Sequence, residues 1–69
     1  MELNVKFIFH FRNGKSLECV DRIIPSDFEC MIKSIKTIMR ERYEDAIVYF
    51  SSCVIRMSEV IAVEWEELS

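Results

Sequence analysis

The alternation of residues 3–11 limits the folds open to this chain more than any other feature of its sequence. Every second residue of the segment is apolar: Leu3, Val5, Phe7, Phe9 and Phe11. A period of two places successive side chains on opposite faces of an extended strand. The segment is therefore predicted to form a strand with one strongly apolar face, and the fold must supply a layer that covers this face.

An Asn-Gly pair follows this segment and predicts a β-hairpin. A two-residue loop would pair Phe9 with Glu18 and place a carboxylate on the apolar face. A three-residue loop with Gly14 in the left-handed conformation pairs Phe9 with Leu17 instead and keeps that face apolar. The pattern favours the three-residue loop, followed by a second strand at about residues 15–22.

The segment that begins at Pro25 has the features of a helix start followed by an amphipathic helix. Ser26 and Glu29 have the spacing of a capping box, in which each side chain bonds the backbone amide of the other residue. Apolar residues then recur at intervals of three and four over about 17 residues. Four of them are expected to line the centre of the helix: Phe28, Ile32, Ile35 and Met39.

The rest of the chain returns to an extended pattern in three segments: residues 46–51, 54–57 and 60–66. A tight turn is expected at residues 52–53, and Ile61, Val63 and Trp65 are expected to share one face of the last strand. The order ββαβββ predicts an α+β fold, with one amphipathic helix packed on a mostly antiparallel, strongly curved sheet. Residues 1–69 are expected to form a single small domain, too short for a deep substrate cavity.

Several of the predicted strands carry apolar residues on both faces. Ile8 and Val20 lie opposite the phenylalanine face of the hairpin, and Ile47 and Tyr49 repeat this pattern in the third strand. One helix can cover only one face of the sheet. The second face must close as a barrel, bind another protein surface, or remain as an exposed apolar patch. Because so small a core is marginally stable, we expect a homo-oligomer, and a dimer first.

The composition limits the partners and cofactors that the chain can bind. A net charge of −3 is too small for strong non-specific binding to nucleic acid. Cys19, Cys30 and Cys53 include no Cys-x-x-Cys pair, and we interpret them as reduced structural thiols. No apolar run approaches the roughly 18 residues of a membrane span, and the first residues do not resemble a signal peptide. We expect a cytoplasmic protein with no membrane partner.

No pattern of residues in the chain predicts an enzyme. His10 is the only histidine, and its expected cross-strand neighbour is Ser16, with no third member of a triad in view. The thiol of Cys30 lies in the first turn of the predicted helix, where Asp27 and Glu29 oppose formation of a thiolate. Phosphate-binding loops and paired carboxylates are absent from the sequence. We therefore expect no catalytic residue, no cofactor and no metal ion.

Two groups of residues are candidate contacts for a partner. The first is an acidic segment that contains the only tryptophan: Glu64, Trp65, Glu66 and Glu67. The second is a basic stripe on the solvent face of the helix: Lys33, Lys36 and Arg40. Tryptophan is enriched at the centres of interfaces, and a basic stripe suits phosphate or an acidic protein surface. Each group also has a structural interpretation. The acidic segment can be an edge strand with a core tryptophan, and the basic stripe can be a solvated helix face.

Two segments resemble small proteins that are common in phages and prophages of Gram-positive bacteria. Residues 9–15 resemble their first strand and Asn/Asp-Gly turn, and residues 54–64 resemble their terminal pattern Ile-x-x-Ser-x-Val/Ile-x-x-Ile/Val-Glu. Arg56 and Met57 depart from this pattern, which often has Asn and Leu there. The resemblance implies an accessory protein that binds a host protein in the host cytoplasm and modulates or inhibits it.

The function expected from the sequence is therefore non-enzymatic binding of a host protein. Two alternatives stay open. One is a small dimeric regulator associated with nucleic acid through the basic helix stripe. The other is a structural subunit that assembles with copies of itself.

Overall fold

The computed structural model describes residues 1–43, 45–51 and 53–68. Its elements in chain order are β1 (Leu3–Phe11), β2 (Ser16–Ile23), α1 (Pro25–Glu41), β3 (Ile47–Tyr49), β4 (Val54–Arg56), the 3-10 helix η1 (Met57–Glu59) and β5 (Val60–Glu67). The strands form a three-stranded sheet in the order β2–β1–β5 and a separate two-stranded sheet, β3–β4. The pairings of the described strands are all antiparallel, and the predicted α+β fold with a mostly antiparallel, curved sheet is confirmed. The sheet is not closed into a barrel, a point that the sequence left open.

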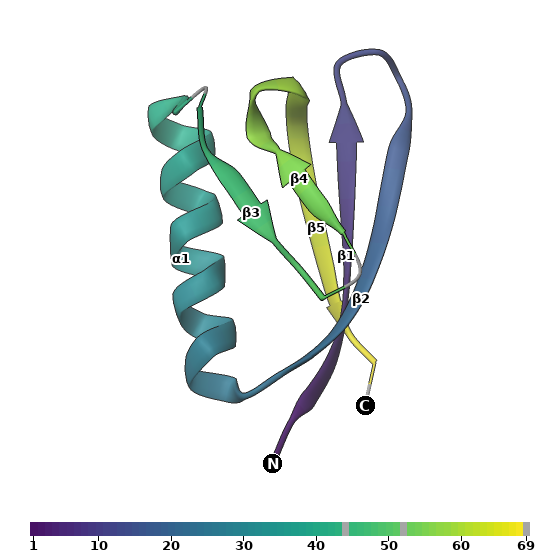
Figure 1. Ribbon diagram of the computed structural model, residues 1–69, viewed down its shortest axis with the longest axis vertical. Helices are drawn as coiled ribbons and strands as arrows, with labels where there is room; N and C mark the ends of the chain where they lie inside the picture. The colour runs from purple at the N-terminus through teal and green to yellow at the C-terminus, as the bar shows by residue number, and fades with distance from the viewer. Residues whose placement is uncertain (44, 52, 69) are drawn as a thin grey trace.

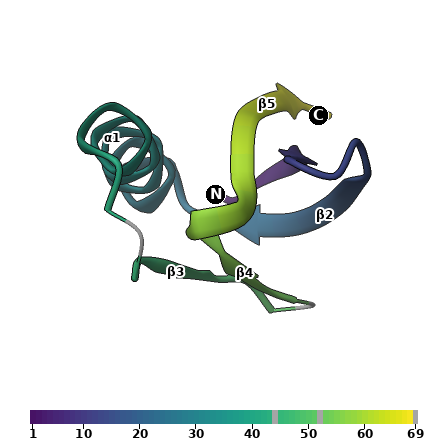
Figure 2. The same ribbon diagram turned by 90° about the horizontal axis from the view of Figure 1, so that it is seen from above.

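The helix and the β3–β4 hairpin enclose the core together with the three-stranded sheet. In Figure 1, α1 runs beside the sheet and the β3–β4 hairpin crosses in front of it. Figure 2 shows the same three parts from above, with α1 to one side and the hairpin beneath the sheet. The largest fully buried side chains come from β1, β2 and α1: Phe7, Phe9, Ile35, Val5 and Cys19.

The register of β1 and β2 is the one that the sequence pattern favoured. Phe9 lies opposite Leu17, as expected for a three-residue loop. Phe11 N–H donates to the carbonyl of Lys15 at 2.8 Å, and Gly14 closes the loop with a φ of 87°. Glycine has no Cβ and adopts this left-handed conformation without strain. This register places Leu17 and Cys19 opposite Phe9 and Phe7, whereas Asp21 lies on the same face opposite Val5.

Helix α1 begins differently from the prediction. Its N-cap is Ile24, Pro25 occupies the first turn, and no side chain makes a capping hydrogen bond. The predicted capping box of Ser26 and Glu29 is therefore wrong, because Pro25, whose fixed φ suits the first helical position, starts the helix before Ser26. Of the four residues expected at its centre, Ile35 is buried, and the other three are partly buried against the core.

A β-bulge changes which residues of β5 face the core. The pairing of β1 with β5 shifts between His10 and Phe11, so that Phe11 lies opposite Val60. Val60 is buried as a result, whereas Ile61 is 58% exposed. The prediction that Ile61 shares one face with Val63 and Trp65 is wrong. An extra residue in one strand reverses the alternation beyond it, and this reversal cannot be read from the period of two.

The β3–β4 hairpin is shorter than the sequence pattern indicated. The extended segments predicted at residues 46–51 and 54–57 each contain a strand of three residues, and Met57 already belongs to η1. The turn predicted at residues 52–53 includes Ser52, which lies outside the described residues. So short a hairpin is not stable alone.

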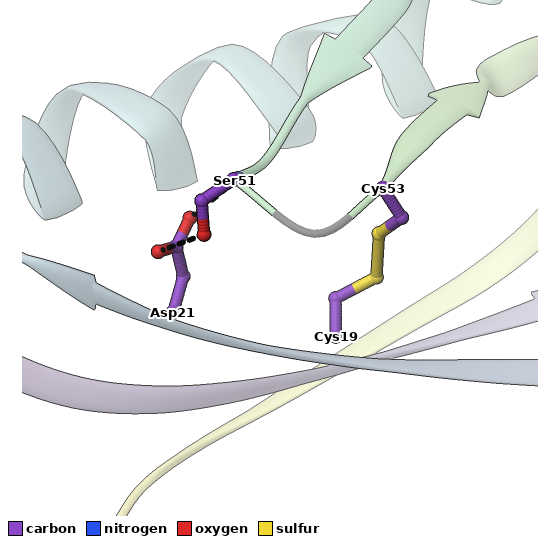
Figure 3. The surroundings of a disulfide bond; sticks show 4 residues. All are labelled: Cys19, Asp21, Ser51 and Cys53. Atoms are coloured by element: carbon purple, nitrogen blue, oxygen red, sulfur yellow. Dashed lines mark hydrogen bonds between the residues drawn. A yellow bond between two sulfur atoms is a disulfide. The ribbon is translucent and has the colours of Figure 1, made fainter.

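Two links attach the hairpin to β2 (Figure 3). Cys19 and Cys53 form a disulfide bond across a sequence separation of 34 residues. The interpretation of these two cysteines as reduced thiols is therefore wrong, whereas Cys30 is free and exposed. Beside the disulfide, the carboxylate of Asp21 accepts hydrogen bonds from Ser51 Oγ at 2.8 Å and from Ser51 N–H at 3.2 Å.

The Asp21 carboxylate is held in its charged form by these contacts. Partial burial acts to raise its pKa, but the hydrogen bonds from the Ser51 hydroxyl, the Ser51 amide and the Arg22 amide outweigh that effect. The net result is a pKa of Asp21 below its ordinary value. The link between β2 and the hairpin is thus a charge-assisted one above acidic pH.

Candidate protein-binding surface

Strand β5 forms one edge of the three-stranded sheet, with β1 on its inner side. Leu68 N–H donates to the carbonyl of Asn4 at 2.7 Å, in continuation of the same ladder. Backbone groups in an antiparallel ladder alternate between the two sides of a strand. Glu64 and Glu66 thus direct their backbone groups toward β1, whereas Val63 and Trp65 direct theirs away from the sheet. In the described part of the chain, no strand pairs with that outer side.

Trp65 connects the two candidate groups that the sequence kept apart. It lies opposite Phe7 in the ladder and therefore on the inner face of the sheet, yet it is 37% exposed. The Lys36 ammonium lies 5.8 Å from the centre of its ring, within the range of a cation–π contact. The structure therefore brings the basic helix stripe to the acidic segment at this one point, with a tryptophan that is only partly covered.

The acidic side chains of β5 divide between two faces. On the outer face, Glu64 Oε2 lies 2.8 Å from His10 Nε2, and Glu66 Oε2 lies 3.6 Å from Lys6 Nζ. These exposed contacts are each worth less than about 1 kcal/mol. Glu67 lies on the inner face, opposite Val5, and has no ion pair among residues 1–43, 45–51 and 53–68.

The other members of the basic stripe lie along the exposed side of α1. Lys33 forms no ion pair with any residue that the structure describes. Arg40 Nε lies 3.4 Å from Glu41 Oε1, an exposed contact between sequence neighbours. Lys33 and Arg40 thus extend a positive surface to both sides of Lys36 along the helix.

A second surface lies on the outer side of the β3–β4 hairpin. Tyr49 and Val54 are cross-strand neighbours and are 68% and 60% exposed, and Ile47 on the same face is also exposed. The sequence signal for this patch was the apolar character of both faces of the third strand. Because the sheet does not close, barrel closure does not cover these side chains.

The surroundings of His10 include one element of a catalytic site. Glu64 bonds one ring nitrogen, and Ser16 is the cross-strand neighbour, as expected. Nucleophilic catalysis needs a nucleophile bonded to the other ring nitrogen. None of the described side chains occupies that place. Nor do the described residues contain a cluster of three or more His, Cys, Asp or Glu that could hold a metal ion.

No helix within the described ranges is long and apolar enough to cross a membrane. Comparison of the chain with protein-family models, with curated proteins and with solved structures finds no match. The geometry of the β5 edge and of the surfaces beside it is therefore the basis for the functional proposal.

Proposed function

We propose that this chain is a non-enzymatic accessory protein that binds a host protein through the open edge of β5. The observation that carries the proposal is the position of Trp65 on that edge, partly exposed and beside backbone groups with which no described strand pairs. An extended segment of a partner can add to such an edge as a further strand, and main-chain hydrogen bonds then supply affinity. Tryptophan is the residue type most often found at interface hot spots.

The charge of the edge favours a partner segment that carries lysine or arginine. Glu64, Glu66 and Glu67 provide three carboxylates within four residues. A second copy paired antiparallel in a register centred on Trp65 would place Glu64 opposite Glu66 of the other chain, and like charges in that position are destabilising. A basic segment of a different protein would instead pair with them.

The resemblance to phage and prophage proteins supports a bacterial host as the source of the partner. Location in the host cytoplasm belongs to the same proposal. The Cys19–Cys53 bond weighs against that location, because cytoplasmic thiols are kept reduced. The nucleic-acid alternative is weaker than protein binding, since Lys36 lies over Trp65 and Arg40 lies beside Glu41.

The proposal is tested by affinity capture from a nuclease-treated Gram-positive host lysate with the wild type and three variants. Glu67→Pro removes an amide that faces the open edge, where proline is tolerated, and Trp65→Ala removes the central side chain. Tyr49→Ala, on the hairpin, is the matched control. We expect one host protein in stoichiometric amount with the wild type and Tyr49→Ala, and at least about tenfold less of it with the two edge variants.

Circular dichroism of each variant establishes that loss of capture is not loss of folding. Equal capture by the wild type and all three variants would exclude the β5 edge as the binding surface. Capture only when the nuclease is omitted would replace the proposal with the nucleic-acid alternative. Recovery of the bait alone as an oligomer would replace it with self-assembly.

A further inference from the structure

A cavity of about 200 Å³ lies between the C-terminal end of α1 and the start of β5. Five apolar side chains contribute to its wall: Ile38, Met39, Met57, Val60 and Ile61. Arg12 and Arg42 also line it, together with Tyr43. The C-terminal end of α1 and the start of β5 are at the top of Figure 1, and the two chain termini are at the bottom.

Among residues 1–43, 45–51 and 53–68, no carboxylate forms an ion pair with either arginine. The ion pairs of the described residues involve Lys6, His10 and Arg40, and neither Arg12 nor Arg42. None of the described lining residues is acidic. The part of the cavity that the structure describes therefore has an apolar wall and two arginines without an ion pair.

Backbone geometry holds both arginines at this place. Arg12 follows the end of β1, its N–H donates to the carbonyl of Glu59 at 2.9 Å, and its Nη2 donates to the carbonyl of Ser58 at 3.4 Å. Arg42 caps α1 in the left-handed conformation with a φ of 57°, and its N–H donates to the carbonyl of Ile38. These contacts fix the two Cα positions. They leave N–H donors on each guanidinium available for a ligand.

The size of the cavity selects among anionic ligands. Pockets for small molecules and cofactors commonly hold about 300–1,000 Å³, so this cavity suits a single amino-acid residue better than a nucleotide. A residue at the C-terminus of a chain carries a carboxylate and a side chain on the same Cα. An internal Asp or Glu would offer its carboxylate on a short stem and leave the apolar wall uncovered.

We infer that this cavity binds the C-terminal residue of a partner chain, with its carboxylate on Arg12 and Arg42 and an apolar side chain against the wall. Arginine pairs with carboxylates through charge-assisted hydrogen bonds in a fixed fork geometry. The inference goes beyond the β5 edge and does not depend on it.

The test consists of two NMR titrations of the ¹⁵N-labelled protein. One uses acetyl-Gly-Gly-Leu, and the other uses the same peptide with a C-terminal amide. The free carboxylate should shift the amides of residues that line the cavity, and the amidated peptide should bind at least about tenfold more weakly. Arg12→Gln and Arg42→Gln should each weaken binding by about tenfold. Arg22→Gln, an exposed arginine on β2 outside the cavity, is the matched control and should bind as the wild type does.

Several outcomes would overturn the inference. Absence of binding, or equal binding of the acid and the amide, would remove the carboxylate from recognition. Binding of inorganic phosphate as tight as that of the peptide would reduce the cavity to a simple anion site. Equal binding of acetyl-Gly-Glu-Gly-amide would show that an internal acidic side chain suffices. None of these results would alter capture by the β5 edge, since the variants of the two experiments lie on different surfaces.

Discussion

The three-stranded sheet and the β3–β4 hairpin are stabilised in different ways. The sheet has two long ladders, and its inner face carries Phe7 and Phe9, which are fully buried. The hairpin has three residue pairs, and its inner side contributes Phe50 and Ile55 to the same core. Continuous burial therefore supports the sheet, whereas the hairpin depends on local links to β2. The comparison predicts that equal changes in the two regions have unequal effects.

The largest effect is expected from truncation of Phe7. The centre of its ring lies 5.1 Å from the ring centre of Phe50 and 6.3 Å from the ring centres of Phe9 and Phe28. Phe7 therefore packs with residues of the sheet, the helix and the hairpin. Phe7→Ala should lower the free energy of unfolding by about 3–5 kcal/mol, measured by urea denaturation. Because this variant can fail to fold, Phe7→Leu is a milder comparison. A loss below about 1 kcal/mol in Phe7→Ala would contradict the account of the sheet.

A smaller loss is expected when the disulfide is removed. The bond closes a loop of 34 residues in sequence separation, and removing such a constraint costs about 2–4 kcal/mol. Cys53→Ala should show this loss relative to the wild type in oxidising buffer, and no such difference in the presence of a reductant. Cys30→Ala, which removes the free thiol, is the control. If the reductant does not reduce the difference in free energy of unfolding between wild type and Cys53→Ala, the bond is not the main attachment of the hairpin.

The contact of Asp21 with Ser51 should contribute about 1 kcal/mol or less, and it should depend on pH. Since the folded-state pKa of Asp21 lies below its ordinary value of 3.8, the charged contact stabilises the fold above that pH. The contribution is lost as the pH falls through the lowered pKa. The stability difference between wild type and Asp21→Asn should therefore be present at pH 7 and should disappear once the pH falls below the lowered pKa of Asp21. A difference that is constant with pH would contradict this explanation.

The smallest effect is expected on the outer face of the hairpin. Tyr49 is largely exposed, and its replacement leaves no cavity in the core. Tyr49→Ser should change the free energy of unfolding by less than about 0.5 kcal/mol. A loss near that of Phe7→Ala would show that a surface not present in the monomer covers this face.

Most of the fold could be predicted from the periodicity of the sequence. The strand at Leu3–Phe11, the three-residue loop and the pairing of Phe9 with Leu17 all follow from keeping one face apolar. The errors occur where a local feature overrides the period, as at Pro25 and at the bulge beside His10. The disulfide could not be predicted, because the distance between Cys19 and Cys53 in space depends on how the hairpin docks.

The candidate surfaces were less accessible to sequence reasoning than the strands. The sequence indicated both the acidic segment and the basic stripe, but their contact at Lys36 and Trp65 depends on where the helix crosses the sheet. The arginine-lined cavity was missed altogether. Arg12 and Arg42 lie in two loops 30 positions apart, and neither loop has a sequence pattern that pairs them.

The Cys19–Cys53 bond also makes folding and oxidation mutually dependent. The bond stabilises the folded chain, and by thermodynamic linkage folding stabilises the bond against reduction by the same free energy. The thiol–disulfide balance of the surroundings therefore acts on this protein as a ligand would. Where that balance is oxidising, the hairpin is held against β2 and its exposed face has a fixed orientation. Where it is reducing, the hairpin is held without the bond, by Asp21 and by the packing of Phe50 and Ile55 in the core.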